Sequence, residues 1–226
     1  GYFVKGLPSS ALSATAHIQI YGDRTTTGSG KLIGTTGEKK RMEGLRLTIK
    51  GAGESGCPSG GIRYRAHVQN IGWQGWKQNG ELAGTKGKSL RMEAIQIELT
   101  GELARYYDVY YSAHVQQLGW LGWAKNGQAA GTTDIGYRLE ALQIRLVSKD
   151  ANAPGPNSNY YTNMKKRRYQ NPSQYYQIKD SITLTGGGYN LSYGFEGVKV
   201  MQVIRKLGLG SGIGMGGAFY GTNVQN

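Results

Sequence analysis

The sequence has one cysteine, Cys57, among its 226 residues. A single thiol excludes an internal disulfide and a cysteine-based metal cluster, and it leaves the redox compartment open. The sequence also lacks an apolar run of 18 or more residues, and no charged segment followed by an apolar one stands at its start. Neither a membrane-spanning helix nor a signal peptide is therefore predicted within these residues.

Acidic residues are scarce: 14 Asp and Glu stand against 27 Lys and Arg, which gives a formal net charge of +13. This charge favours anionic partners, among them nucleic acid, anionic lipid and the phosphate-bearing polymers of a bacterial wall. The aromatic residues do not interleave with Lys and Arg along a continuous stripe, which weighs against nucleic acid. We therefore expect no nucleic-acid partner and no membrane insertion.

What the sequence does contain is an internal repeat. Three segments, 16–19, 66–69 and 113–116, share a histidine at their second position. A Gly-Thr pair and an Arg-x-Glu triplet follow each histidine at constant distances; the pairs are Gly34-Thr35, Gly84-Thr85 and Gly131-Thr132, and the triplets start at Arg41, Arg91 and Arg138 and end at Glu43, Glu93 and Glu140. Equal spacing predicts three copies of one structural unit, at about residues 12–50, 62–100 and 109–147.

Each copy is predicted to consist of short antiparallel strands. Residues 63–71, 90–99, 110–118 and 137–147 alternate in character, and Asn79-Gly80 and Asn126-Gly127 are two-residue hairpin signals. One copy is too small to bury its own apolar face, so three copies are expected to close around a shared axis. The predicted fold class for residues 1–150 is all-β with pseudo-threefold symmetry, and a β-prism and a β-trefoil both satisfy it.

All four tryptophans lie in the second and third copies, in Gly72-Trp73-x-Gly75-Trp76 and Gly119-Trp120-x-Gly122-Trp123, whereas the first copy has Asp23 and Thr26. Indole faces suit stacking on sugar rings, and the flanking glycines indicate close approach of a ligand. The alternative is that Trp73 and Trp120 fill the core. The predicted ligand-binding residues are Trp73, Trp76, Trp120, Trp123, Asn79, Asn126, Lys77 and Lys125.

The three histidines, His17, His67 and His114, could converge on a zinc ion if a threefold axis relates them. Each lies in an alternating strand beside alanine, however, so structural histidines bonded to Glu43, Glu93 and Glu140 are predicted instead. Arg and Glu two positions apart share one strand face and predict a scaffold network. No metal, no cofactor and no catalytic residue is expected, because a glycosidase needs two converging carboxylates.

Residues 151–159 contain proline, glycine and small polar residues and predict a linker to a second module at 160–226. Within that module, 181–185 has strand character, and apolar spacing predicts a helix over 198–207. The basic run Lys165, Lys166, Arg167 and Arg168 is predicted to contact an anionic polymer; a solvated charged face is the alternative. The chain starts at Gly1 and stops within a pattern, so we expect a fragment of a longer protein.

The pattern GWxGWxxNGxxAGTxG followed by LRxEAxQIxL, at 72–99 and 119–146, resembles the ChW (clostridial hydrophobic, Trp-containing) repeat. The resemblance covers about residues 14–147 in three copies, of which the first is partial. Residues 194–208 and 217–224 resemble the first part of a small peptidoglycan-binding module.

These resemblances are to the cell-wall-binding part of a Gram-positive or phage cell-wall hydrolase. They imply a secreted or cell-surface location and non-catalytic binding to peptidoglycan or a teichoic-type polymer. A covalently linked catalytic domain, which would lie outside this chain, would thereby be held at the wall. The alternative is an adhesion or scaffold module that binds another protein.

Overall fold

The computed structural model describes residues 6–54, 56–163, 181–186 and 189–194. The chain divides into two compact units, Gly1–Asn163 and Met164–Asn226. In the part that is described, strands dominate, and the helical elements are the 3-10 turn η1 (Ser9–Ala11) and the single-turn helix α1 (Leu103–Tyr106). The all-β class is therefore confirmed.

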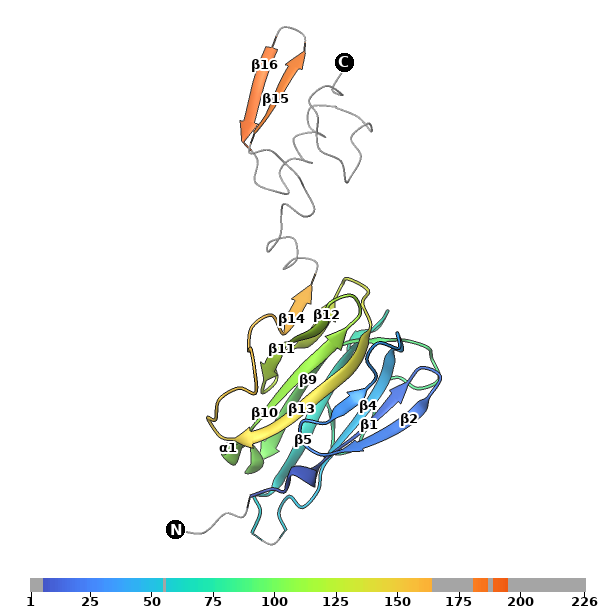
Figure 1. The fold of residues 1–226 in the computed structure, drawn as a ribbon, viewed down its shortest axis with the longest axis vertical. Helices are drawn as coiled ribbons and strands as arrows, with labels where there is room; N and C mark the ends of the chain where they lie inside the picture. The colour runs from blue at the N-terminus through green and yellow to red at the C-terminus, as the bar shows by residue number, and fades with distance from the viewer. Residues whose placement is uncertain (1–5, 55, 164–180, 187–188, 195–226) are drawn as a thin grey trace. The chain divides into compact units, whose positions relative to one another are not determined.

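Each repeat of the first unit is built on a pair of long antiparallel strands (Figure 1). The pairs are β1 (Leu12–Ile18) with β4 (Met42–Ile49), β5 (Gly60–Val68) with β9 (Met92–Gly101), and β10 (Tyr107–Val115) with β13 (Leu139–Ser148). The register shifts at the equivalent place in all three pairs, directly after the histidine. The repeats seen in the sequence are thus three equivalent structural units, called below the first, second and third repeats.

The strands that carry or follow the Trp positions pair with the other edge of β1, β5 and β10. They are β2 (Gly22–Thr27) in the first repeat, β6 (Gly72–Trp73) and β7 (Lys77–Gln78) in the second, and β11 (Gly119–Lys125) in the third. The second repeat thus has an interruption between Trp73 and Lys77, where the third has one continuous strand.

The next short strand of each repeat crosses to a neighbouring sheet. β8 (Ala83–Gly84) pairs with β4 of the first repeat, β12 (Ala130–Thr133) with β9 of the second, and β3 (Leu32–Gly34) with β13 of the third. The sheet of each repeat is thus completed by a strand from another repeat, and the exchange closes into a ring.

The Asn-Gly turns start this crossing. Asn79 and Gly80 have φ values of 43° and 93°, and Asn126 and Gly127 of 39° and 84°, so the predicted positive-φ turns are confirmed. The predicted hairpins are wrong, because the strands on the two sides of each turn belong to different sheets. A local turn signal sets backbone conformation, whereas strand partners are chosen by distant residues.

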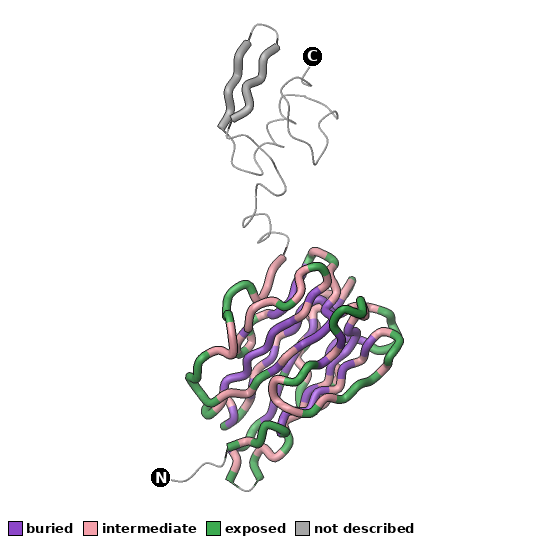
Figure 2. The backbone as a smooth tube through the Cα atoms, viewed as in Figure 1, coloured by how far each residue is buried: buried purple, intermediate pink, exposed green. Residues whose placement is uncertain are grey.

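Buried residues follow the inner strands of the three sheets, and most exposed residues lie in loops (Figure 2). One continuous apolar core therefore lies within the first unit. The largest of its fully buried side chains are Tyr64 and Tyr111.

The first compact unit extends to Asn163, past the boundary at residue 150 that the sequence predicted. Residues 154–160 lie against the third repeat, and β14 (Tyr161–Asn163) pairs in parallel with β12. The predicted linker thus contributes backbone hydrogen bonds to the folded unit.

The second compact unit contains one antiparallel pair, β15 (Ser181–Gly186) and β16 (Tyr189–Gly194), and β15 confirms the strand predicted there. The predicted helix at 198–207, the basic run at 165–168 and nearly all of the segment that resembles a peptidoglycan-binding module lie outside the described residues. Within the described residues, no helix is long and apolar enough to cross a membrane.

Candidate functional site

The outer face of the second repeat carries alternating cationic and aromatic side chains. Strand alternation buries Tyr64 and Ala66 and turns Arg63, Arg65 and His67 outward. The guanidinium carbons of Arg63 and Arg65 both lie 4.9 Å from the ring centre of Trp76. Arg65 also lies 5.3 Å from the ring of Trp73, so each indole is within cation–π range.

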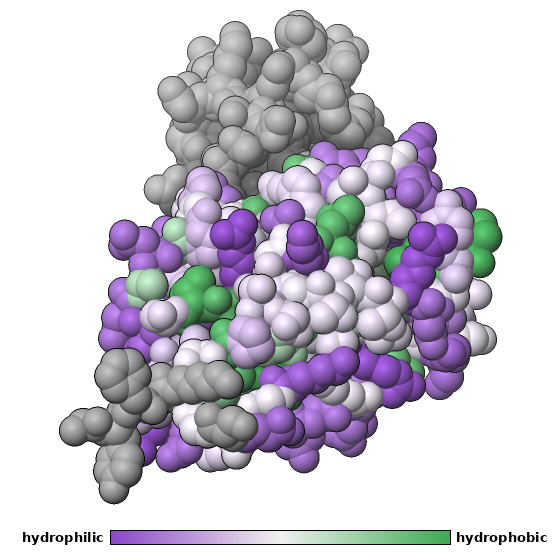
Figure 3. Space-filling view, turned by 60° about the horizontal axis from the view of Figure 1, so that its bottom comes forward, coloured by the Kyte–Doolittle hydropathy of each residue, from purple (hydrophilic) through white to green (hydrophobic). Residues whose placement is uncertain are grey.

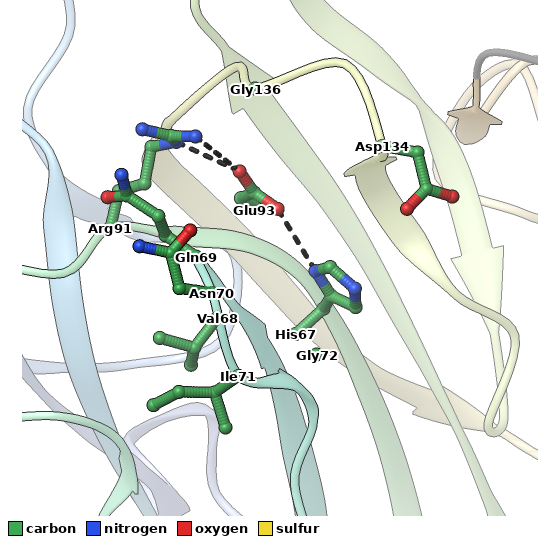
Figure 4. A pocket seen from close by; sticks show the side chains of 10 residues that line it. All are labelled: His67, Val68, Gln69, Asn70, Ile71, Gly72, Arg91, Glu93, Asp134 and Gly136. Atoms are coloured by element: carbon green, nitrogen blue, oxygen red, sulfur yellow. Dashed lines mark hydrogen bonds and ion pairs between the residues drawn. The ribbon is translucent and has the colours of Figure 1, made fainter.

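His67 continues this row. Its ring meets Trp73 edge-on, with centres 5.4 Å apart and planes at 76°. On its other side, Nδ1 of His67 lies 3.1 Å from Glu93, and Arg91 donates to the same carboxylate at 2.9 Å (Figure 4). We call the side chains of Arg63, Trp76, Arg65, Trp73 and His67 the aromatic–cationic row.

Glu93 anchors one end of this row. Its side chain is only 7% exposed, and burial raises its pKa, but hydrogen bonding to His67 and Arg91 outweighs burial and holds the pKa below its ordinary value. Glu93 is therefore ionised at neutral pH and fixes the position of the His67 ring.

The Arg-x-Glu network that the sequence predicted is confirmed in all three repeats, with Nε–O distances of 2.8–2.9 Å. The predicted His–Glu partners are confirmed for His67 and His114, whose Nδ1 atoms each lie 3.1 Å from the carboxylate. For the first repeat the prediction is wrong: His17 contacts Asp23 at 2.5 Å instead of Glu43. Asp23 occupies the Trp position there and brings a carboxylate closer.

A shallow hollow of about 400 Å³ lies next to His67, at the junction of the second and third repeats. Figure 4 shows His67, Arg91 and Glu93 together, with Gly136 of the third repeat next to Arg91 and Asp134 farther along the same loop. Within the described residues, no three His, Cys, Asp or Glu side chains are placed to hold a metal ion. The hollow offers a cation, a carboxylate and an imidazole to a polar ligand.

The third repeat has the same His–Trp geometry, but its second tryptophan is covered. His114 and Trp120 are 5.3 Å apart at 76°, and Trp120 is 42% exposed. The backbone N–H of Trp123 donates to the carbonyl of Pro156 at 2.8 Å, so residues 154–160 occupy the edge beside this indole. Tyr110 and Ser112 stand where the second repeat has Arg63 and Arg65.

The first repeat has ion pairs where the others have tryptophan. Asp23 contacts both His17 and Lys86 of the second repeat, and the Lys86 contact is 2.7 Å long. Thr26 donates to the carbonyl of Leu32. The aromatic–cationic row is therefore specific to the second repeat.

The four other predicted ligand-binding residues lie outside the aromatic–cationic row, and three of them have structural partners. Asn79 and Asn126 accept the backbone N–H of Ile62 and Val109 through their side-chain oxygens, at 3.1 and 2.9 Å, which fixes the turns. Lys125 pairs with buried Asp108 at 2.8 Å. Lys77 is half-buried in β7, next to Trp76 in the chain.

The structure thus brings Trp73 and Trp76 together and adds two residues that the sequence prediction missed, Arg63 and Arg65. A signal for them was present. Both arginines precede His67 at intervals of two, so strand alternation alone places the three on one face.

No curated protein and no solved structure matches this chain. A family model described as ChW, clostridial hydrophobic W, matches residues 67–101 and 114–148. The first repeat and the C-terminal segment lie outside these two matches. The matches begin at His67 and His114 and include both tryptophan pairs, so the similarity to this family lies in the second and third repeats, in tandem.

Proposed function

We propose that this chain binds a polymer of the Gram-positive cell wall at the cell surface and holds a covalently linked enzyme there, without catalysing a reaction itself. The observation that supports this function is the aromatic–cationic row of the second repeat. It presents two guanidinium groups on β5 and, beside them, two partly exposed indoles from β6 and the residues that follow it.

The chemistry of the row suits such a polymer. Indole faces stack on the apolar faces of sugar rings, and guanidinium groups bind phosphate or carboxylate through directed hydrogen bonds. Arg63 and Arg65 are already held by Glu98 and Gln96, at 2.5 and 2.6 Å, so little side-chain entropy is lost on binding. A net charge of +13 favours encounter with an anionic wall.

Hydrophobic residues form small separate groups on the coloured part of the face that Figure 3 shows. Binding through a few aromatic rings fits this surface better than a broad apolar contact. For the architecture, we propose a β-prism over a β-trefoil, because the strands of the three repeats divide into three separate sheets, each completed by a neighbour.

The test is a pull-down of the full chain on insoluble Gram-positive peptidoglycan, before and after acid removal of secondary polymers. We expect Trp73→Ala/Trp76→Ala to weaken retention by at least about tenfold, because a buried aromatic anchor contributes on the order of 2 kcal/mol. Arg65→Gln should weaken binding to the untreated wall more than to the stripped wall. Equal retention of the double variant and the parent chain would contradict the proposal.

Trp120→Ala is the matched control, since Trp120 is exposed but has no arginine over its ring among the described residues. It should lose less retention than the Trp73/Trp76 double variant. Stripping separates the ligands: binding that persists indicates glycan strands or stem peptides, and binding that is lost indicates teichoic-type polymers.

A second candidate is a surface module that binds another protein. The observation in its favour is the third repeat, where the edge beside Trp123 already holds a polypeptide, residues 154–160. Protease treatment of the wall preparation would abolish retention in this case and leave glycan binding unchanged.

A further inference from the structure

The third repeat shows how a Gly-Trp edge of this fold accepts a polypeptide. The N–H of Trp123 donates to Pro156 at 2.8 Å, and the N–H of Gly122 donates to Asn159 at 3.4 Å. Gly155 lies close to the indole: a Cβ there would be 2.9 Å from Nε1 of Trp123. The edge thus accepts a bent segment, with bends at 154–155 and 158–159, that has a glycine beside proline.

Gly122 itself makes room for this segment. A Cβ at Gly122 would lie 1.8 Å from the carbonyl oxygen of Ser158, so only glycine permits the contact. The backbone of the occupant therefore passes directly over the Cα atom of the glycine that precedes Trp123.

The same edge is open in the second repeat. Gly75 and Trp76 are the equivalents of Gly122 and Trp123, and a Cβ at Gly75 would have no atom within 4 Å. Among the described residues, no hydrogen-bond acceptor is found for the backbone N–H groups of Gly75 and Trp76. Both donors and the space for an occupant are thus present.

A neighbouring difference limits how long the occupant can be. In the third repeat the N–H of Gly131 donates to Tyr160, where residues 161–163 begin to pair with β12. In the second repeat the side-chain amide of Gln74 replaces this segment. It accepts a hydrogen bond from the N–H of Gly84 at 2.6 Å and donates one to the carbonyl of Gly84 at 3.1 Å. Leu121 stands at the equivalent position of the third repeat and can do neither.

From this comparison we infer that the Gly75-Trp76 edge binds a short segment of a partner protein that contains Gly-Pro and bends as residues 155–159 do. Two carbonyl oxygens of the segment accept hydrogen bonds from the N–H groups of Gly75 and Trp76, and its glycine lies beside the indole of Trp76. It carries no positive charge beside that ring, because Arg63 and Arg65 flank it. This goes beyond wall binding, because it uses the backbone N–H groups of Gly75 and Trp76.

The test uses the full chain and a terminally blocked synthetic peptide with the sequence of residues 152–160. Amide signals of Gly75 and Trp76 are followed by nuclear magnetic resonance as the peptide is added up to millimolar concentrations. We expect both signals to shift. A peptide in which alanine replaces both prolines should shift them less, because its free backbone is less restricted and loses more entropy on binding.

Gly75→Ala is the decisive variant. Its methyl group meets open space in the free protein, so the fold is kept, but it takes the place of the occupant's backbone and should weaken peptide binding by at least about tenfold. Gly6→Ala, another glycine where a Cβ makes only ordinary contacts, is the matched control and should leave binding unchanged.

Three results would overturn the inference. The first is that the Gly75 and Trp76 signals do not shift, and the second is that Gly75→Ala and the parent chain bind the peptide with equal affinity. The third is that only the Gly122 and Trp123 signals shift, which would mean that the peptide only exchanges with the chain's own segment. Wall retention is measured on the same Gly75→Ala variant. If Gly75→Ala loses peptide binding but keeps full wall retention, both proposals are supported. If the parent chain binds the peptide but not the wall, only the wall proposal is refuted.

Discussion

At the scale of single residues, two buried tyrosines join neighbouring repeats. The hydroxyl of Tyr64 accepts the backbone N–H of Leu47 in the first repeat at 2.9 Å and donates to the carbonyl of Glu81. The hydroxyl of Tyr111 does the same with Ile97 of the second repeat and with Gln128. Burial raises the pKa of both phenols, so they remain protonated and able to donate.

Tyr111→Phe should lower the free energy of unfolding by about 1–3 kcal/mol, because it leaves a buried N–H and a buried C=O without a partner. Tyr106→Phe is the control, since Tyr106 is 46% exposed, and it should change little. Urea unfolding followed by tryptophan fluorescence measures both. Equal midpoints for the two variants would show that the hydroxyl of Tyr111 does not link the repeats energetically.

Asp108 is the charged residue most deeply buried in the third repeat. Its side chain is 0% exposed and contacts Lys125, Lys149 and Asn126. Burial raises its pKa, but these contacts outweigh burial and hold the pKa well below the ordinary value of 3.8. The ionised form is therefore the one that the fold requires.

The sign of the pH effect follows from this lowered pKa. The contribution of Asp108 to stability is fully present above its unfolded pKa and is lost as the pH falls from about 4 towards the folded pKa. Asp108→Asn should destabilise the fold at pH 7 by about 1–3 kcal/mol and flatten the loss of stability below pH 4. Thermal unfolding from pH 7 to pH 2 checks this; an unchanged slope in Asp108→Asn would assign the acid sensitivity to other carboxylates.

At the scale of strands, the glycine of each Gly-Thr pair explains why this landmark recurs. Gly34, Gly84 and Gly131 have φ values of 96°, 90° and 111°, and a Cβ at any of them would lie within 2.5 Å of a carbonyl oxygen on the facing strand. Only glycine lets the crossing strand approach the neighbouring sheet.

Gly84→Ala should therefore lower the free energy of unfolding by about 1–3 kcal/mol or more, because both the backbone conformation and the contact with Glu43 oppose a methyl group. Gly75→Ala, the same change at an open glycine of the same repeat, should change it by less than about 0.5 kcal/mol. Chemical unfolding of the two variants is compared with that of the parent. Similar stabilities would contradict the tight strand crossing.

Much of each element could be predicted from local sequence, but its partner could not. Alternation located the long strands to within a few residues, and Asn-Gly located the turns. The chain then crosses to another sheet because Gly80 donates to Leu47 and Gly127 to Ile97, contacts between different repeats that no local pattern encodes. The Gly-Thr pairs were visible as landmarks, although their role depends on a strand from another repeat.

The candidate site divides in the same way. The tryptophans and the His–Glu–Arg contacts could be read from repeated spacing, because they lie on two paired strands of one repeat. The contact of residues 154–160 with the edge beside Trp123 could not be predicted from the sequence. These residues have the composition of a linker, and they fit there only because Gly122 lacks a side chain. In the first repeat, His17 contacts Asp23 instead of Glu43, because Asp23 stands where the other repeats have tryptophan.

At the scale of the first compact unit, the cyclic exchange of strands makes the three repeats interdependent. The sheet of each repeat lacks one strand next to its long pair until another repeat supplies it. The core is shared in the same way, since one buried cluster includes residues of all three repeats. Unfolding of this unit should therefore be a single cooperative transition.

Deletion of the first repeat, residues 1–51, tests this interdependence. It removes β4, the partner of β8, and β3, the partner of β13, so both remaining repeats lose strand pairing and core contacts. We expect the shortened chain to show poorly dispersed amide signals and no cooperative thermal transition, even though both ChW matches are intact. A chain that ends at Asn163 retains all three repeats and should unfold cooperatively. A folded, monomeric chain without the first repeat would show instead that the ChW pair is self-sufficient and that ring closure contributes little to stability.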